Sequence, residues 1–414
     1  MKLLKPIAVG LLVIVAVASC SKVKEAALER GIDLFMAGEL EEALKVLDAS
    51  AKISAENPDA HAWYAECLRR LKKFDDAADA AYMALDLDPE HAFAHTVLAD
   101  VFNPQYSTWQ RVDAESTWFH LQEAVRYDPG DGNAWSSLWV QAVERQDEEM
   151  AHTAAVNMID SGFLSAPVLA YNRWQLEHLP PNAIFLTNGD MDTYPSVALQ
   201  EKEGLRQDVV VANLSLLNVA PYVARTAKKY GVPLPVGPDQ LESMAPRRGD
   251  KGTIEPVGRQ IVRGWIEMQQ RGELSRPLCA AITVADLDFA PGVGERTVYC
   301  GSYYEIMPTL VEAETDVARL EQSLAAIDAA SFEGAFATIV DRSPVRRSGT
   351  HRIATNVTAA MLRYVEHLAG EERWDEASSA LAGARDYDSR ILAAGSYTDH
   401  MDSLSVEIAK HLEP

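Results

Sequence analysis

Two aspartates one residue apart, Asp190 and Asp192, come shortly after the apolar run Ala183–Thr187. A second apolar run, Val209–Asn213, also ends in polar residues. Ligands of open parallel sheets bind just beyond the carboxyl ends of the strands, so two neighbouring strands would bring these polar residues to one rim. The candidate ligand-binding residues on this rim are Asn188, Asp190, Asp192, Thr193, Tyr194, Asn213, Ser215 and Asn218.

The acidic pair admits three interpretations. In a turn, Asp190 and Asp192 could converge on one hard cation, which prefers oxygen ligands, and they are therefore the candidate metal ligands. Beside a substrate, one carboxylate could act as a general base. Alternatively, Asp190 satisfies turn amides after Gly189, and Asp192 caps a helix that has Pro195 in its first turn. A lone Asp-x-Asp pattern is a weak motif, so we assign no catalytic residue.

The motifs of several enzyme classes are missing from the sequence. It has no glycine-rich phosphate loop with a lysine, no His-Glu-x-x-His and no Gly-x-Ser-x-Gly. Thr193 follows Asp192 directly, which does not fit the Asp-x-Asp-x-Thr spacing of haloacid dehalogenases. A second acidic pair, Asp286 and Asp288, precedes a Pro-Gly and is expected in a loop. We expect no cofactor and favour a function other than catalysis.

Strands and helices alternate in the segment that contains the aspartates. Apolar runs rich in Val, Ile, Leu and Thr predict strands at Ala183–Thr187, Val209–Asn213, Leu278–Val284 and Thr297–Cys300, with Tyr303–Ile306 as an additional edge strand. Helical stretches are predicted at Pro195–Glu203, Val219–Tyr230, Val257–Arg271 and Thr309–Ala329. Such alternation is typical of a parallel sheet covered by helices. Cys279 and Cys300 lie in two of these strands and could form a disulfide if the strands are adjacent.

A repeat of about 34 residues flanks this segment. Ala43 matches Ala77 and Ser50 matches Ala84, which puts small residues where two helices of a pair cross. The segments 24–57, 58–91, 92–131 and 132–165 resemble tetratricopeptide units, the third with an insertion, and a further unit spans about 358–391. His61 and His95 occupy matching positions and are expected to pack rather than to bind a ligand. The predicted fold class is therefore α plus α/β, with tetratricopeptide helical repeats flanking a small parallel-sheet α/β domain.

Stacked helix pairs form a solenoid whose curved face commonly binds a segment of another protein. The repeats therefore predict a protein partner, and the alternative is that the array packs on the central domain of its own chain.

The first residues resemble a bacterial lipoprotein signal. Lys2 and Lys5 precede the apolar run Ile7–Ala18, and Cys20 follows small residues. The resemblance implies cleavage before Cys20 and acylation of that residue, for example with palmitate. Ser21 in place of aspartate favours the outer membrane, with the chain facing the periplasm. The alternatives are an ordinary signal peptide or an uncleaved anchor; no later run predicts a membrane span.

The net charge of the chain excludes some classes of binding partner. Lysine and arginine number 38 against 61 aspartates and glutamates, a formal net charge of −23. This balance argues against binding nucleic acid and against binding anionic lipid through a basic face. After Cys20, three cysteines remain, so at least one of them is a free thiol or bonds to another chain.

The central segment also resembles a known family. The stretches "LPPNAIFLTNGDMDTYP", "LRQDVVVANLSLLN", "RPLCAAITV" and "RTVYCGSYYEIMP" occur in this order between Leu176 and Pro308. They resemble the soluble C-terminal part of a membrane glycosyltransferase-like family of unknown function that is related to protein O-mannosyltransferases. Met191 departs from the asparagine usual there. The resemblance implies the central fold and the polar rim, whereas glycosyl transfer would reside in the membrane-embedded part of that family.

These observations predict a lipid-anchored scaffold of the cell envelope that binds a protein partner through its repeats. The alternative is a ligand-binding or enzymatic accessory protein in glycan assembly that uses the Asp190 and Asp192 rim. The expected domains are a signal peptide at 1–19, a lipidated N-terminus at 20–23, a repeat array at 24–179, the α/β domain at 180–308 and a helical C-terminal region at 309–414.

Overall fold

The computed structural model describes residues 23–105, 107–248, 253–284, 287–312, 314–332, 353–391 and 395–412. Cys20, the predicted signal peptide and Asp286 lie outside these ranges. The described residues fall into two compact units, divided after Leu138 within helix α7 (Gly132–Arg145). Within these ranges, no helix is both long enough and apolar enough to cross a membrane.

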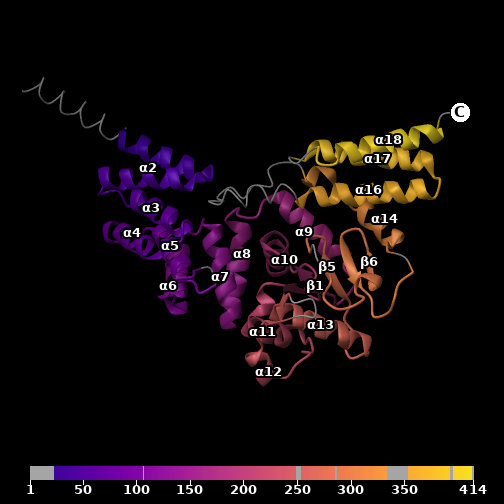
Figure 1. Ribbon diagram of the computed structural model, residues 1–414, viewed down its shortest axis with the longest axis horizontal. Coiled ribbons are helices and arrows are strands. Elements are labelled where there is room, and N and C mark those ends of the chain that lie inside the picture. The colour runs from indigo at the N-terminus through magenta and orange to yellow at the C-terminus, as the bar shows by residue number, and fades with distance from the viewer. Residues whose placement is uncertain are drawn as a thin grey trace, which may run out of the picture. The chain divides into compact units, whose positions relative to one another are not determined.

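The first unit consists of helices that stack in pairs (Figure 1). Residues 23–36 are helical and precede α2 (Leu40–Ile53), α3 (Pro58–Arg70) precedes α4 (Phe74–Leu87), and α5 (Ala92–Phe102) precedes α6 (Ala114–Tyr127). The small residues expected at the crossings, Ala43, Ser50, Ala77 and Ala84, are fully buried. The helix pairs and the predicted fold class, α plus α/β with tetratricopeptide repeats, are therefore confirmed.

A recurring side-chain hydrogen bond connects each pair to the turn before it. The His61 Nε2 atom lies 3.0 Å from the Ala55 carbonyl, and the His95 Nε2 atom lies 3.2 Å from the Pro89 carbonyl. In the next pair, the Trp135 indole donates to the Pro129 carbonyl over 2.9 Å. Each bond spans six residues and satisfies a carbonyl in the turn that follows the preceding helix. Both histidines thus pack against the preceding turn through their Nε2 atoms.

The second unit contains a five-stranded sheet with the order β2-β1-β5-β7-β6. Strands β1 (Ile184–Thr187), β2 (Val210–Asn213) and β5 (Leu278–Ala281) are parallel, and every residue in them is buried. Strand β7 (Tyr303–Ile306) pairs antiparallel with both β5 and β6 (Thr297–Tyr299). The sheet is therefore mixed, and β6, not β7, is the edge strand, because a short β6–β7 connection permits only a hairpin.

Strand β7 also decides the state of the two strand cysteines. It lies between β5, which holds Cys279, and β6, which Cys300 follows. Both residues are buried free thiols, so they form no disulfide. Burial raises the pKa of the Cys300 thiol to about 12, and Cys67 is likewise a buried free thiol.

Helices cover the sheet. They are α9 (Ala166–His178), α10 (Asp190–Glu203), α11 (Ala220–Tyr230) and α13 (Val257–Gln270), with the short elements η1 (Leu216–Asn218), α12 (Pro238–Ser243), β3 (Arg247–Arg248), β4 (Ile254–Glu255) and η2 (Gly294–Arg296) between them or after them. Helix α10 begins at Asp190, five residues before the predicted start at Pro195. The acidic pair therefore belongs to the first turn of a helix and not to a separate turn.

Helix α8 (Glu148–Asp160) packs directly on α10. The Glu148 carboxylate binds the largely buried Arg225 guanidinium of α11 through two hydrogen bonds of 2.7 Å. Lys229 bonds to Glu201 over 2.8 Å, and the Trp139 ring meets Tyr194 edge-on. The second helix of the fourth predicted repeat is thus bound to the helices that flank the sheet.

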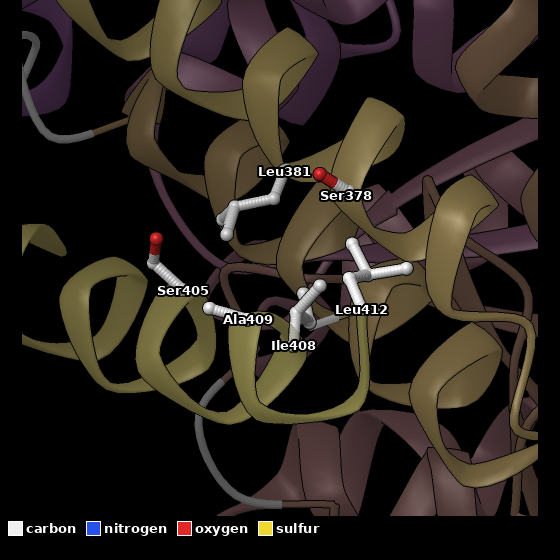
Figure 2. A pocket seen from close by; sticks show the side chains of 6 residues that line it. All are labelled: Ser378, Leu381, Ser405, Ile408, Ala409 and Leu412. Carbon is white, nitrogen blue, oxygen red and sulfur yellow. The ribbon is translucent and has the colours of Figure 1, made fainter. Parts of the chain in front are cut away.

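The C-terminal part of the second unit is helical. Helix α14 (Val317–Ala325) is shorter than the predicted Thr309–Ala329 and is followed by η3 (Ala329–Phe332). Helices α16 (Thr355–Gly370), α17 (Trp374–Arg390) and α18 (Thr398–Leu412) lie side by side (Figure 1). The Trp374 and His411 rings stack at 3.9 Å. Figure 2 shows a small groove between α17 and α18 where Leu381 and Ile408 contribute its apolar walls.

Candidate functional site

The two strands that carry the predicted rim are neighbours. Thr187 at the end of β1 is in register with Asn213 at the end of β2. The Thr193 hydroxyl lies 2.7 Å from the Thr187 hydroxyl and accepts a hydrogen bond of 2.8 Å from the Asn213 amide. All three side chains are buried. These hydrogen bonds thus attach the start of α10 to the ends of both strands.

Asp192 is the charged member of this region and is almost fully buried. Its carboxylate accepts hydrogen bonds of 2.8 Å from the backbone amides of Asn188 and Gly189, and a short one from the Thr283 hydroxyl. Burial raises the pKa of the Asp192 carboxyl, while these hydrogen bonds act in the opposite direction. The carboxylate reaches back to amides at the N-terminus of α10, as the capping interpretation predicted, although from the third helical position.

A proline inside α10 creates a second requirement. Pro195 has no N–H, so it cannot donate to the carbonyl of Met191 four residues earlier. The side-chain amide of Asn172, from α9, donates to that carbonyl over 2.9 Å. The Ser196 hydroxyl donates in turn to the Asn172 amide oxygen over 3.0 Å. Asn172 therefore takes the place of the missing backbone donor and holds α9 against α10.

The asparagines of the rim also have partners within the chain. The Asn213 amide oxygen accepts from the backbone amides of Ser215 and Leu216, each over 2.9 Å. The Asn218 amide oxygen accepts from Gly258 at the start of α13 over 2.9 Å. Its amide nitrogen donates to the Ser215 carbonyl over 3.0 Å. Both side chains therefore shape the connection between β2 and the following helices.

Asp192, Thr193, Asn213 and Asn218 of the eight candidate residues bond to groups within the chain. Asn188 and Ser215 have exposed side chains, Asp190 is half-buried, and Tyr194 packs on Trp139. Among the described residues, no group of three or more histidine, cysteine, aspartate or glutamate side chains could hold a metal ion. Ligand or metal binding at the rim stays a prediction. The carboxylate of the rim that a ligand could reach is that of Asp190.

The sequence interpretation missed Asn172 and Thr283. Pro195 was a signal that the Met191 carbonyl needs another donor, but nothing in the sequence identified a residue of α9 as that donor. Thr283 lies 91 positions from Asp192, and only the register of β5 beside β1 brings the two together.

Two family models match parts of the chain. Residues 34–101 match the tetratricopeptide repeat, and residues 169–254 match a family described as TMEM260-associated domain 2. No curated protein sequence matches the chain. Together with the helix pairs, the first match shows that the chain contains tetratricopeptide repeats.

Solved structures of tetratricopeptide proteins are similar to parts of the chain. A tetratricopeptide protein of Thermus thermophilus has 16% identity over 33% of this chain and 73% of its own, with a TM-score of 0.30. PilF of Pseudomonas aeruginosa has 15% identity over 51% of this chain and 86% of its own, with a TM-score of 0.31. Likenesses of this size carry no information on what the chain binds.

The bonding of Asp192 leads to a stability prediction. The pKa of Asp192 is higher in the folded chain than in the unfolded chain. The carboxyl therefore stabilises the fold at a pH below its unfolded pKa, and this contribution is lost as the pH rises through the folded pKa. Replacing Thr283 with valine removes a donor to the carboxylate and raises this pKa further. We expect Thr283→Val to lower the free energy of unfolding by about 1.5–3 kcal/mol at neutral pH, and by less in acid.

Denaturant unfolding followed over a range of pH measures this effect. Thr283→Ser keeps the hydroxyl and should remain close to the wild type. Equal stability of the valine variant and the wild type at neutral pH would show that the hydroxyl does not support the carboxylate.

Proposed function

We propose that this protein is a lipid-anchored scaffold of the bacterial cell envelope that binds a protein partner through its tetratricopeptide repeats. The observation that carries the proposal is a set of exposed apolar side chains on the second helices of two successive repeats. Tyr82, Met83 and Leu87 on α4 and Phe119 on α6 each expose between 42% and 54% of their surface. Exposed apolar side chains gathered on one set of elements are typical of protein interaction sites.

Photo-crosslinking tests the repeat surface. With benzoylphenylalanine in place of Tyr82 or Phe119, we expect both positions to crosslink to the same envelope protein in cells. Lys45 is exposed on α2 and serves as the control position, where this adduct should be missing. No adduct at Tyr82 and Phe119, or the same adduct at Lys45, would contradict a partner on this surface.

The anchor rests on the lipoprotein signal around Cys20. We expect Cys20→Ala to abolish incorporation of radiolabelled palmitate, because it removes the thiol that carries the acyl group. In the wild type, the acyl chains supply about 0.8 kcal/mol of membrane affinity per buried methylene. Density fractionation of the wild type should place it with the outer membrane, facing the periplasm. A Cys20→Ala chain that still incorporates palmitate would contradict acylation at Cys20.

The second candidate is a ligand-binding or enzymatic accessory function in glycan assembly, with glycan-assembly machinery as the partner. The observation that favours it is the accessible edge of the rim, where Asn188, Asp190 and Ser215 lie beyond two buried parallel strands. This is the place where open α/β sheets bind ligands. The internal bonding of Asp192, Asn213 and Asn218 weighs against it.

A thermal-shift screen with divalent metals, sugars and nucleotide-sugars tests this second function. A ligand at a hundred times its dissociation constant stabilises the folded chain by about 2.7 kcal/mol. Asp190→Asn should abolish that shift, and it leaves the buried Asp192 carboxylate in place. If no ligand shifts the wild type, the rim is structural.

A further inference from the structure

A groove lies between α2 and α4, with α3 at its base. It has a volume of about 530 Å³, and its apolar lining includes Ala51, Ala80, Met83 and the ring of Tyr64. His61 of α3 also lines it. Every described residue of this groove belongs to the first unit, so the groove is a property of the repeats alone.

The next repeat has the same groove, but its own side chains fill it. Helix α6 corresponds to α4 with an offset of 40 residues, set by the shared Asp-Pro that follows each helix. Phe119 and His120 therefore stand where α4 has Asp79 and Ala80. The Nδ1 atom of His120 lies 2.9 Å from the Nδ1 atom of His95, the counterpart of His61. The first groove is open because an alanine replaces a histidine.

The histidine pair shows what the first groove lacks. The His95 Nε2 atom faces the Pro89 carbonyl and must carry the proton, so its Nδ1 atom accepts from His120. By the same argument, the bond from His61 Nε2 to Ala55 leaves His61 Nδ1 as an acceptor. Within the described part of the chain, no hydrogen bond to His61 Nδ1 is found. A side chain that fills this groove would satisfy His61 Nδ1 by offering an N–H or O–H donor.

The charge at the rim of the groove selects the kind of donor. Asp76 and Asp79 line the groove, and neither forms an ion pair with any residue that the structure describes. Asp48 and Lys52 also line the groove and pair with each other over 2.6 Å. A cationic donor gains from both carboxylates and from the formal charge of −23 on the chain. A guanidinium adds a flat face that stacks on an aromatic ring such as Tyr64.

We propose that this groove binds an arginine side chain of the protein partner, with an aromatic residue next to that arginine. The guanidinium donates to His61 Nδ1 and pairs with Asp76 and Asp79. The neighbouring aromatic ring packs on Met83, in the way that Phe119 accompanies His120 in the next repeat. The inference rests on the proposed scaffold function and adds the site and the chemistry of the partner segment.

The test uses full-length chain in detergent and an array of acetylated octapeptides in a Gly/Ser background, carrying every pair of adjacent residue types. We expect the strongest binding from peptides that combine arginine with phenylalanine, tyrosine or tryptophan. Replacing the arginine by the neutral citrulline should weaken binding by at least about tenfold, or ~1.4 kcal/mol. Added salt should weaken it as well.

Variants of α4 locate the binding site. Ala80→His fills the groove as His120 does in the next repeat, and Asp79→Phe fills it at the exposed rim, where folding tolerates the change. Both should abolish peptide binding with the melting temperature maintained, and Asp76→Asn should reduce binding. Asp86→Asn removes a carboxylate from an exposed position of the same helix outside the groove and should leave binding unchanged.

Two results would overturn the inference. One is an array without a preference for arginine next to an aromatic residue. The other is unchanged peptide binding by the folded Asp79→Phe and Ala80→His variants. Either result leaves the scaffold function intact if Tyr82 and Phe119 still crosslink to a partner, whereas loss of those crosslinks alone contradicts the scaffold function.

Discussion

The burial of the Asp192 carboxylate is the constraint around which the central domain is arranged. A carboxylate removed from water is costly unless hydrogen-bond donors replace the water molecules. The donors come from two backbone amides at the end of β1 and from Thr283 after β5. Helix α10 can therefore start here only if β1 and β5 are neighbours in the observed register. The same turn then aligns Thr193 with Thr187 and Asn213.

Similar local compensation explains why the polar rim is crowded. Pro195 deprives a buried helix of one donor, and Asn172 supplies it from α9. Asn213 and Asn218 provide acceptors for amides of η1 and α13 that have no helical partner. Polar residues at the ends of parallel strands resemble a ligand site in sequence, because binding and structural capping use the same side chains.

The sequence predicted the helices and strands far better than the contacts between distant residues. The 34-residue period and the apolar runs were sufficient for the helix pairs, for β1 and β2 and for the helical cover of the sheet. They could not place β7 inside the sheet, since strand order depends on how the β6–β7 hairpin docks. They placed the start of α10 at Pro195, because proline favours a first turn. Thr283 and Asn172 were beyond reach, since their contacts depend on packing between distant segments.

The repeats could bind a partner protein or pack on the central domain of their own chain. These two possibilities concern different helices. Glu148 holds helix α8 on α11 through Arg225, and Trp139 of α7 packs on Tyr194 of α10, so the fourth predicted repeat uses its surface within the chain. In α6, His120 fills the groove beside His95, and Phe119 stays exposed next to it. Only one residue type at the position of Ala80 separates a filled groove from an open one. Repeats of equal backbone geometry can thus differ in whether they bind, and the side chains of the second helix decide it.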